Sequence, residues 1–123
     1  MKKAVWILLV LFLSGCAAAV VGGVAAVGTY TYVAGQLKYT HNGNLDNTYQ
    51  AALKACSSLQ LMIMNQDKKL SKASLRVKEG DRDIWITFTV VSSTTTEVSI
   101  RVGYFGDEVA SRKIHEEIRA NLR

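Results

Sequence analysis

Two cysteines and two histidines are the residues of this 123-residue sequence with the most versatile chemistry. The histidines, His41 and His115, lie far apart in the sequence and have no metal-ligand spacing. A metal site needs three or four converging nitrogen, sulfur or oxygen ligands. His41 falls in an expected turn, and His115 falls on the charged face of an expected helix. We therefore expect both imidazoles to be solvated, and the sequence predicts neither a metal site nor a cofactor.

The sequence also lacks the motifs of common catalytic sites. It contains no Gly-x-Ser-x-Gly nucleophile turn, no phosphate-binding loop and no cysteine–histidine pairing. The adjacent acids Glu116 and Glu117 are expected to face solvent on a helix rather than to act as a general acid and base. These observations predict that the protein is not an enzyme.

Cys16 has a sequence context that predicts a covalent modification. Lys2 and Lys3 precede ten uninterrupted apolar residues, Ala4–Leu13, which is a pattern typical of a secretory signal. This stretch is too short for a transmembrane helix, which needs about 20 residues. The run Leu13-Ser14-Gly15-Cys16 resembles the bacterial lipobox at every position. The resemblance implies that the Cys16 thiol receives a diacylglycerol, that the signal peptide 1–15 is removed and that the new amino terminus is acylated.

The segment that follows is expected to be a tether, spanning residues 16–34 with the lipidated cysteine. It is rich in alanine, valine and glycine and carries no charge up to Val33. Ala18, Gly22 and Ala26 recur every fourth residue, a spacing that allows close contact between helices in membranes. Two alternatives therefore stay open, an uncleaved membrane anchor that includes Ala4–Val27 and self-association through the small residues.

The charge of the chain argues against one class of partner. The net charge of +5 falls to +3 when the signal, with its two lysines, is removed. Such a mild excess does not indicate nucleic-acid binding. It is compatible with a position near an anionic membrane surface, where each nearby basic residue contributes about 1 kcal/mol.

Residues 35–123 are expected to form one globular α+β domain. Strict alternation of apolar and polar residues predicts an antiparallel sheet with one buried face. Three consecutive strands are expected from this alternation, over Leu70–Lys78, Ile84–Val91 and Glu97–Val102. Two further strands are expected from β-forming residues in Tyr30–Tyr39 and from the apolar run Leu61–Met64, with a turn over Asn65–Lys69.

Two helices complete the expected fold. Apolar residues at spacings of three and four predict a helix from Asp46 to Leu59, capped by Asn44 or Asp46, with Cys56 in the core. A second amphipathic helix follows Asp107, with apolar residues every four positions. The sequence thus predicts a mostly antiparallel sheet with two helices packed on one face, in the order β-α-β-β-β-β-α.

A proposed strand register brings an aromatic residue and two cations together. Pairing Val77 with Ile84, and Val90 with Val98, keeps the apolar residues of both hairpins on one face. The other face then carries Arg76, Trp85 and Gly103 in one row, with Arg101 diagonal to Trp85. Exposed arginine–tryptophan contacts contribute about 0.5–1 kcal/mol, and both residue types are enriched at binding hot spots. Arg76, Trp85 and Arg101 are therefore the candidate partner-binding residues; the alternative is that Trp85 merely covers the bare backbone of Gly103.

Three stretches carry a further resemblance. They are Gly35-Gln36-Leu37, Leu45–Ala51 and above all Val98–Asp107, with its run Ile-Arg-Val-Gly-x-Phe-Gly-Asp. In these the chain resembles a family of small bacterial lipoproteins of uncharacterised function. The resemblance implies a lipidated, exported α+β domain and supplies no catalytic residue. Ala17, directly after Cys16, resembles the outer-membrane sorting pattern of Gram-negative lipoproteins.

These features predict a lipid-anchored protein of the bacterial cell envelope, on the outer membrane and facing the periplasm, with a non-catalytic binding or structural role. Its expected contacts are the membrane, through the anchor, and an envelope protein or glycan. The alternative is a membrane-associated structural protein that self-assembles through its Ala/Gly-rich N-terminal segment.

Overall fold

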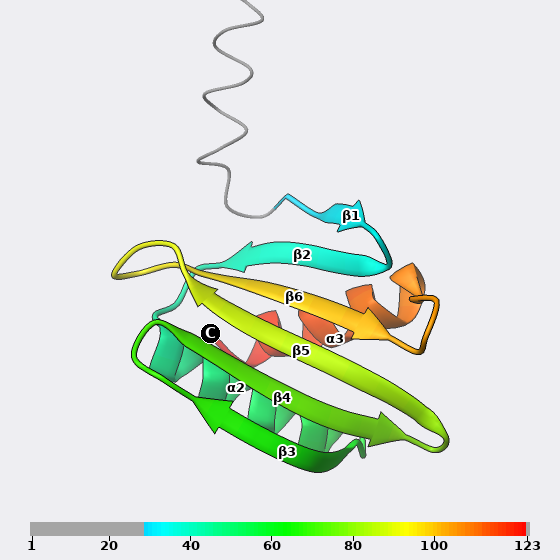
Figure 1. Ribbon diagram of the computed structural model, residues 1–123. Helices are drawn as coiled ribbons and strands as arrows, with labels where there is room; N and C mark the ends of the chain where they lie inside the picture. The colour runs from blue at the N-terminus through cyan, green and yellow to red at the C-terminus, as the bar shows by residue number, and fades with distance from the viewer. Residues whose placement is uncertain (1–28, 123) are drawn as a thin grey trace, which may run out of the picture.

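The computed structural model describes residues 29–122 (Figure 1). The signal sequence, Cys16, Ala17 and most of the tether lie outside the described residues. In chain order the elements are β1 (Thr31–Val33), β2 (Gln36–His41), α2 (Leu45–Ser58), β3 (Met62–Lys68), β4 (Lys72–Glu79), β5 (Arg82–Val90), β6 (Thr96–Val102) and α3 (Glu108–Asn121).

The described strands form one six-stranded antiparallel sheet in the order β1-β2-β6-β5-β4-β3, and both helices pack on the same face of it (Figure 1). The expected α+β class, the antiparallel sheet and the placement of the helices are confirmed. The order is ββαββββα, because the expected first strand is a hairpin. Ala34 and Gly35 turn the chain between β1 and β2 with positive φ angles of 53° and 82°. β1 comes from the segment assigned to the tether.

β3 is longer than expected. The predicted turn over Asn65–Lys69 is wrong, because pairing with β4 continues to Lys68 after a bulge between Ile63 and Asn65. Polar contacts with α2 hold this edge strand: the Tyr49 hydroxyl donates to Gln66 Oε1 at 3.1 Å, and Lys68 forms an ion pair with Asp46. The residues after Met64 are polar and show no apolar alternation, which explains why only the first part of the strand was predicted.

The two central hairpins differ in how well their register was predicted. Between β4 and β5, Val77 pairs with Ile84 as expected. Between β5 and β6, Val90 pairs with Thr96 and not with Val98, so the predicted register is wrong by two residues. A shift of two keeps every side chain on its expected face, so alternation could not detect it. The shorter loop is closed by backbone bonds from Val91 and Ser92 to the Thr95 carbonyl.

The core lies between the sheet and the helices. It is built from the alternating apolar residues of β4, β5 and β6 together with one face of each helix. Asn44 caps α2 by accepting from the backbone N–H of Asn47, and Asp107 caps α3 through Ala110. Cys56 is fully buried in this core, as expected. Among residues 29–122, no helix lies on the opposite face of the sheet, so the described part of the fold leaves this face open (Figure 1).

Candidate functional site

The uncovered face of the sheet carries the predicted aromatic–cation group at its centre. Arg76 on β4, Trp85 on β5 and Arg101 on β6 are direct cross-strand partners. The corrected register of β6 therefore places Arg101 opposite Trp85, where diagonal contact was expected. It also moves Gly103 out of this row. A Cβ added to Gly103 would meet only Arg82 within 4 Å, so the alternative in which Trp85 covers Gly103 is wrong. We call these three residues the Trp85 row.

Each arginine of the Trp85 row has an oxygen of a neighbouring residue close to its guanidinium. An Nη atom of Arg76 lies 3.6 Å from a carboxylate oxygen of Asp83, and Arg101 Nη2 donates to the Tyr104 carbonyl at 2.6 Å. The Arg101 Nε is buried without a protein partner. Trp85 remains 37% exposed between the two cations. The row thus presents an indole to solvent between two positively charged groups.

A shallow hollow adjoins the Trp85 row. Its volume is about 200 Å³. Arg76 and Trp85 line it, and Asn65, Ser74 and Thr87 add amide and hydroxyl groups. An aromatic surface with hydrogen-bonding groups around it can bind a partner that offers a flat apolar group and several acceptors. No carboxylate, imidazole or thiol is among its lining residues, so its hydroxyl groups have no general base there.

A second group of polar residues lies inside the protein and was not predicted. His41 and His115, expected to be solvated, are 1% and 0% exposed, so both predictions are wrong. Their rings stack with centroids 5.3 Å apart, and His41 Nε2 lies 3.0 Å from His115 Nδ1. Tyr30 and Tyr39 pack around them.

The hydrogen bonds of the histidine pair define its tautomers. His115 Nε2 lies 2.8 Å from the Leu37 carbonyl, which can only accept, so Nε2 carries the proton. His115 Nδ1 is therefore an acceptor and His41 Nε2 is its donor. His41 Nδ1 is then unprotonated and buried, and it has no hydrogen-bond partner among residues 29–122. Both imidazoles are neutral and act as a link between β2 and α3.

Burial determines the ionisation of this pair. It lowers the pKa of His41 to about 3, with the neighbouring His115 and Arg119 acting in the same direction. It lowers the pKa of His115 to about 4, against the opposing effect of the Leu37 hydrogen bond. Imidazoles with such pKa values are poor bases at neutral pH, so the pair is structural rather than catalytic.

Part of this burial could have been read from the sequence. Leu37, Tyr39 and His41 alternate on β2, which places His41 on the inner face. Ser111 and His115 are four residues apart on α3, next to Ile114 and Ile118, so the buried face is wider than its isoleucine stripe. The hydrogen bond between the two rings joins residues 74 positions apart and had no local signal.

Other reactive groups in the described part of the chain offer little chemistry. Burial raises the pKa of the Cys56 thiol to about 11, which makes it a weak nucleophile. Residues 29–122 contain no cluster of three or more metal-ligating side chains. No helix among them is long and apolar enough to cross a membrane.

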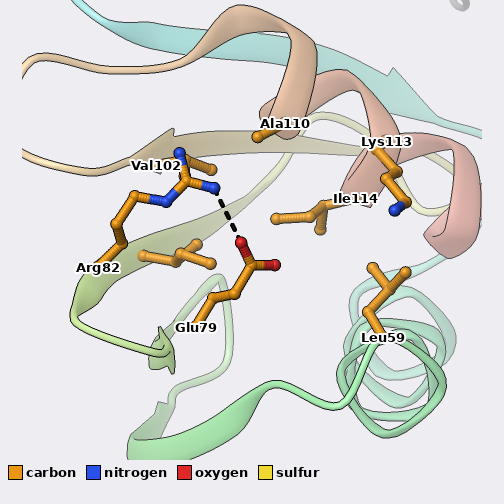
Figure 2. Close-up of a pocket in the computed structure, with 8 residues that line it drawn as sticks. Leu59, Glu79, Arg82, Val102, Ala110, Lys113 and Ile114 are labelled. Atoms are coloured by element: carbon orange, nitrogen blue, oxygen red, sulfur yellow. Dashed lines mark hydrogen bonds and ion pairs between the residues drawn. The ribbon is translucent and has the colours of Figure 1, made fainter.

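A pocket of about 180 Å³ opens where the two helices and the β4–β5 hairpin meet (Figure 2). Leu59, Ala110 and Ile114 supply apolar walls, and Glu79 and Arg82 form an ion pair of 2.8 Å at its edge. Arg82 is also paired with Asp107 at 3.0 Å. The guanidinium is thus already engaged on two sides, and the pocket is an end of the core rather than a site of chemistry.

Comparison with known families places the chain. A family model described as "Protein of unknown function (DUF3568)" matches residues 3–121. The chain belongs to this family. The matched residues include the described fold and the segment that contains Cys16. The predicted membership of a family of uncharacterised function is therefore confirmed. A search of curated proteins gave no match.

Proposed function

We propose that this DUF3568 protein is a lipid-anchored component of the bacterial cell envelope, with Cys16 as the lipidated residue. On this proposal residues 1–15 are a cleaved signal and the folded domain faces the periplasm from the outer membrane. The complete lipobox-like run and the Ala17 that follows it support the proposal. The role is non-catalytic, because the groups described above lack the pKa values and neighbours that catalysis needs.

The proposed activity is binding of an envelope protein or glycan through the uncovered sheet face. The observation that carries this proposal is the Trp85 row, in which a partly exposed indole lies between two cations on a face without helices. Trp and Arg together are typical of binding hot spots. Arg101 is already oriented by its hydrogen bond to the Tyr104 carbonyl, so it would lose little conformational entropy on binding.

Substitution of the indole tests this role. A photoreactive residue at Thr87, which lines the hollow, is expected to crosslink to a discrete partner in cells. Trp85→Ala is expected to weaken that crosslink by roughly 30-fold, the effect of losing a hot spot of about 2 kcal/mol. The circular dichroism spectrum should be unchanged, because Trp85 lies outside the core.

Val91→Ala is the matched control, because Val91 is also exposed but lies in the β5–β6 loop. It should crosslink as the native protein does. If the Trp85→Ala protein crosslinks as strongly as the native protein, the Trp85 row is not the binding site.

A further inference from the structure

Exposed apolar side chains gather at one end of the sheet. Tyr104, Phe105 and Val109 are 79%, 88% and 80% exposed, and Tyr32 and Val33 of β1 are 40% and 56% exposed. We call these five residues the apolar tip. Isolated exposed apolar residues are common, but a contiguous group of large ones marks an interaction site.

Backbone contacts bring the two halves of the apolar tip together. The β1–β2 turn and the β6–α3 loop lie side by side at the right of Figure 1. Gly35 and Gly106 approach so closely that a Cβ added to Gly106 would lie 2.6 Å from the Gly35 Cα and 2.8 Å from the Tyr32 hydroxyl. Tyr32 therefore lies beside the loop that carries Tyr104 and Phe105, although the two segments are about 70 positions apart in the chain.

The loop that carries the two aromatic residues is held in place. Arg101 donates to the Tyr104 carbonyl, Asp107 caps α3 and accepts from Arg82, and the Tyr104 and Phe105 rings meet edge to face at 5.2 Å. These bonds present Tyr104 and Phe105 outward without burying them. A rigid exposed aromatic pair costs little further ordering on contact.

The chain enters the fold next to this tip. Tyr30 lies under the Arg112 guanidinium of α3, 4.4 Å from its ring centroid, and β1 begins at the next residue. Twelve residues separate Cys16 from Thr29, so a fully extended chain spans at most about 45 Å. A lipid on Cys16 would therefore keep Thr29, where the described fold begins, within that distance of the bilayer.

We propose that the apolar tip inserts into the interfacial layer of the phospholipid bilayer that carries the anchor; this inference rests on the lipid anchor proposed above. Tyrosine and tryptophan side chains are enriched at this depth, because the ring can contact acyl chains while its polar group contacts water. The charges nearby are of both signs, with Arg82 and Arg112 paired to Asp107 and Glu108. Insertion therefore depends on apolar contact and not on anionic lipid.

A fluorescent reporter on the tip tests the proposal. Phe105→Cys is labelled with an environment-sensitive dye in the full-length lipidated protein, where Cys16 carries lipid and Cys56 is buried. In phosphatidylcholine vesicles the emission should shift to the blue and be quenched by brominated acyl chains, with little change on addition of salt. Val109→Cys, on the helix side of the tip, should respond in the same way.

Leu70→Cys is the matched control. Leu70 is an aliphatic residue that is 100% exposed in the β3–β4 turn, at the opposite end of the sheet. A label there should keep its aqueous emission. Equal responses from positions 70 and 105 would overturn the proposal. So would a label at 105 that is shielded from aqueous iodide but not quenched by brominated lipid, because the tether or a protein would then cover the tip.

Failure of the anchor is measured separately. Mass spectrometry of the same protein shows whether a fatty acid is present. If it is absent, the unlipidated protein is added directly to vesicles. If the blue shift at position 105 persists, the tip is still a membrane contact and only the proposed lipid anchor is rejected. If the blue shift is lost, both proposals are rejected.

Discussion

A hydrogen-bonded pair of neutral imidazoles lies where β2 meets α3. His41 donates to His115, and His115 donates to the Leu37 carbonyl, so each ring nitrogen except His41 Nδ1 has a partner. Protonation of His115 Nδ1 would set two donors against each other. Protonation of His41 Nδ1 would create a buried donor without an acceptor, near Arg119. The pair is stable only while both rings are neutral.

We expect the free energy of unfolding to fall as the pH drops below about 6.5. The unfolded chain binds a proton on each histidine near that pH, whereas the folded chain resists protonation until about pH 4 or 3, so acid favours unfolding. Each imidazole contributes a slope of up to about 1.4 kcal/mol per pH unit. Urea titrations between pH 7 and 5 measure this slope before the carboxylates begin to titrate.

His115→Phe is the control for this slope. It should lower the stability at pH 7 by about 1–3 kcal/mol, because it leaves the Leu37 carbonyl and the His41 N–H without partners. Its loss of stability between pH 7 and 5 should be about half that of the native protein. An unchanged slope would show that the histidines are not the groups that titrate.

At the scale of secondary-structure elements, two turns that are distant in the sequence pack against each other. The Gly35 turn joins β1 to β2, and the Gly106 loop joins β6 to α3. Both glycines have positive φ angles, and a Cβ on Gly106 would lie 2.5 Å from the Gly35 carbonyl oxygen. The obstructing atoms belong to the backbone, so they cannot shift without distorting the turn. Position 106 therefore needs glycine for two reasons, the positive φ angle and the lack of space for a side chain.

Gly106→Ala should therefore lower the free energy of unfolding by about 3 kcal/mol, the sum of left-handed strain and overpacking. Gly80→Ala is the control. Gly80 also has a positive φ, of 61°, but an added Cβ would meet nothing within 4 Å, so the cost should be about 1 kcal/mol. Denaturant unfolding of both variants measures the difference. Equal losses would mean that the contact between the turns contributes nothing.

The sequence predicted elements better than it predicted their contacts. Alternation on β4, β5 and β6 identified three strands and the face that each buries, because a half-covered sheet imposes that period on the residues themselves. It could not set the β5–β6 register, since Val90 reaches the same face whether it meets Thr96 or Val98. The three residues of the Trp85 row were predicted correctly, but the alignment of Arg101 with Trp85 was not. The histidine pair was not predicted, because it depends on a contact between β2 and α3 that leaves no local pattern in the sequence.

At the scale of the whole molecule, the protein has a covered face, an open face and an apolar end. The two helices cover one face of the sheet, the Trp85 row lies on the other, and the apolar tip lies beside the point where the chain enters (Figure 1). If the tip touches the bilayer, the open face is held to one side of the membrane contact. The Trp85 row then stays accessible to a partner in the envelope.

The anchor itself is tested by the mass of the native protein. We expect the mature chain to begin at Cys16 and to carry diacylglycerol and an N-acyl group, because the residues before it resemble the lipobox throughout. Cys16→Ser should lose both and retain Met1. Cys56→Ser, which changes the buried thiol, should be lipidated like the native protein. A native chain that begins at Met1 without fatty acid would favour an uncleaved anchor.

The shortness of β1 affects how the domain would respond to tension. This three-residue strand is the first element of the described residues, and among them it pairs only with β2, starting at the Thr31–Lys38 pair. A pull on the anchor, away from the sheet, would load these pairs one after another, as in the opening of a zipper. Release of Tyr30–Ala34 would lengthen the connection by roughly 17 Å and would separate Tyr30 from His115, while the other five strands stay paired. The first strand would thus detach under tension before the rest of the sheet unfolds, and its detachment would lengthen the link between the membrane and the domain.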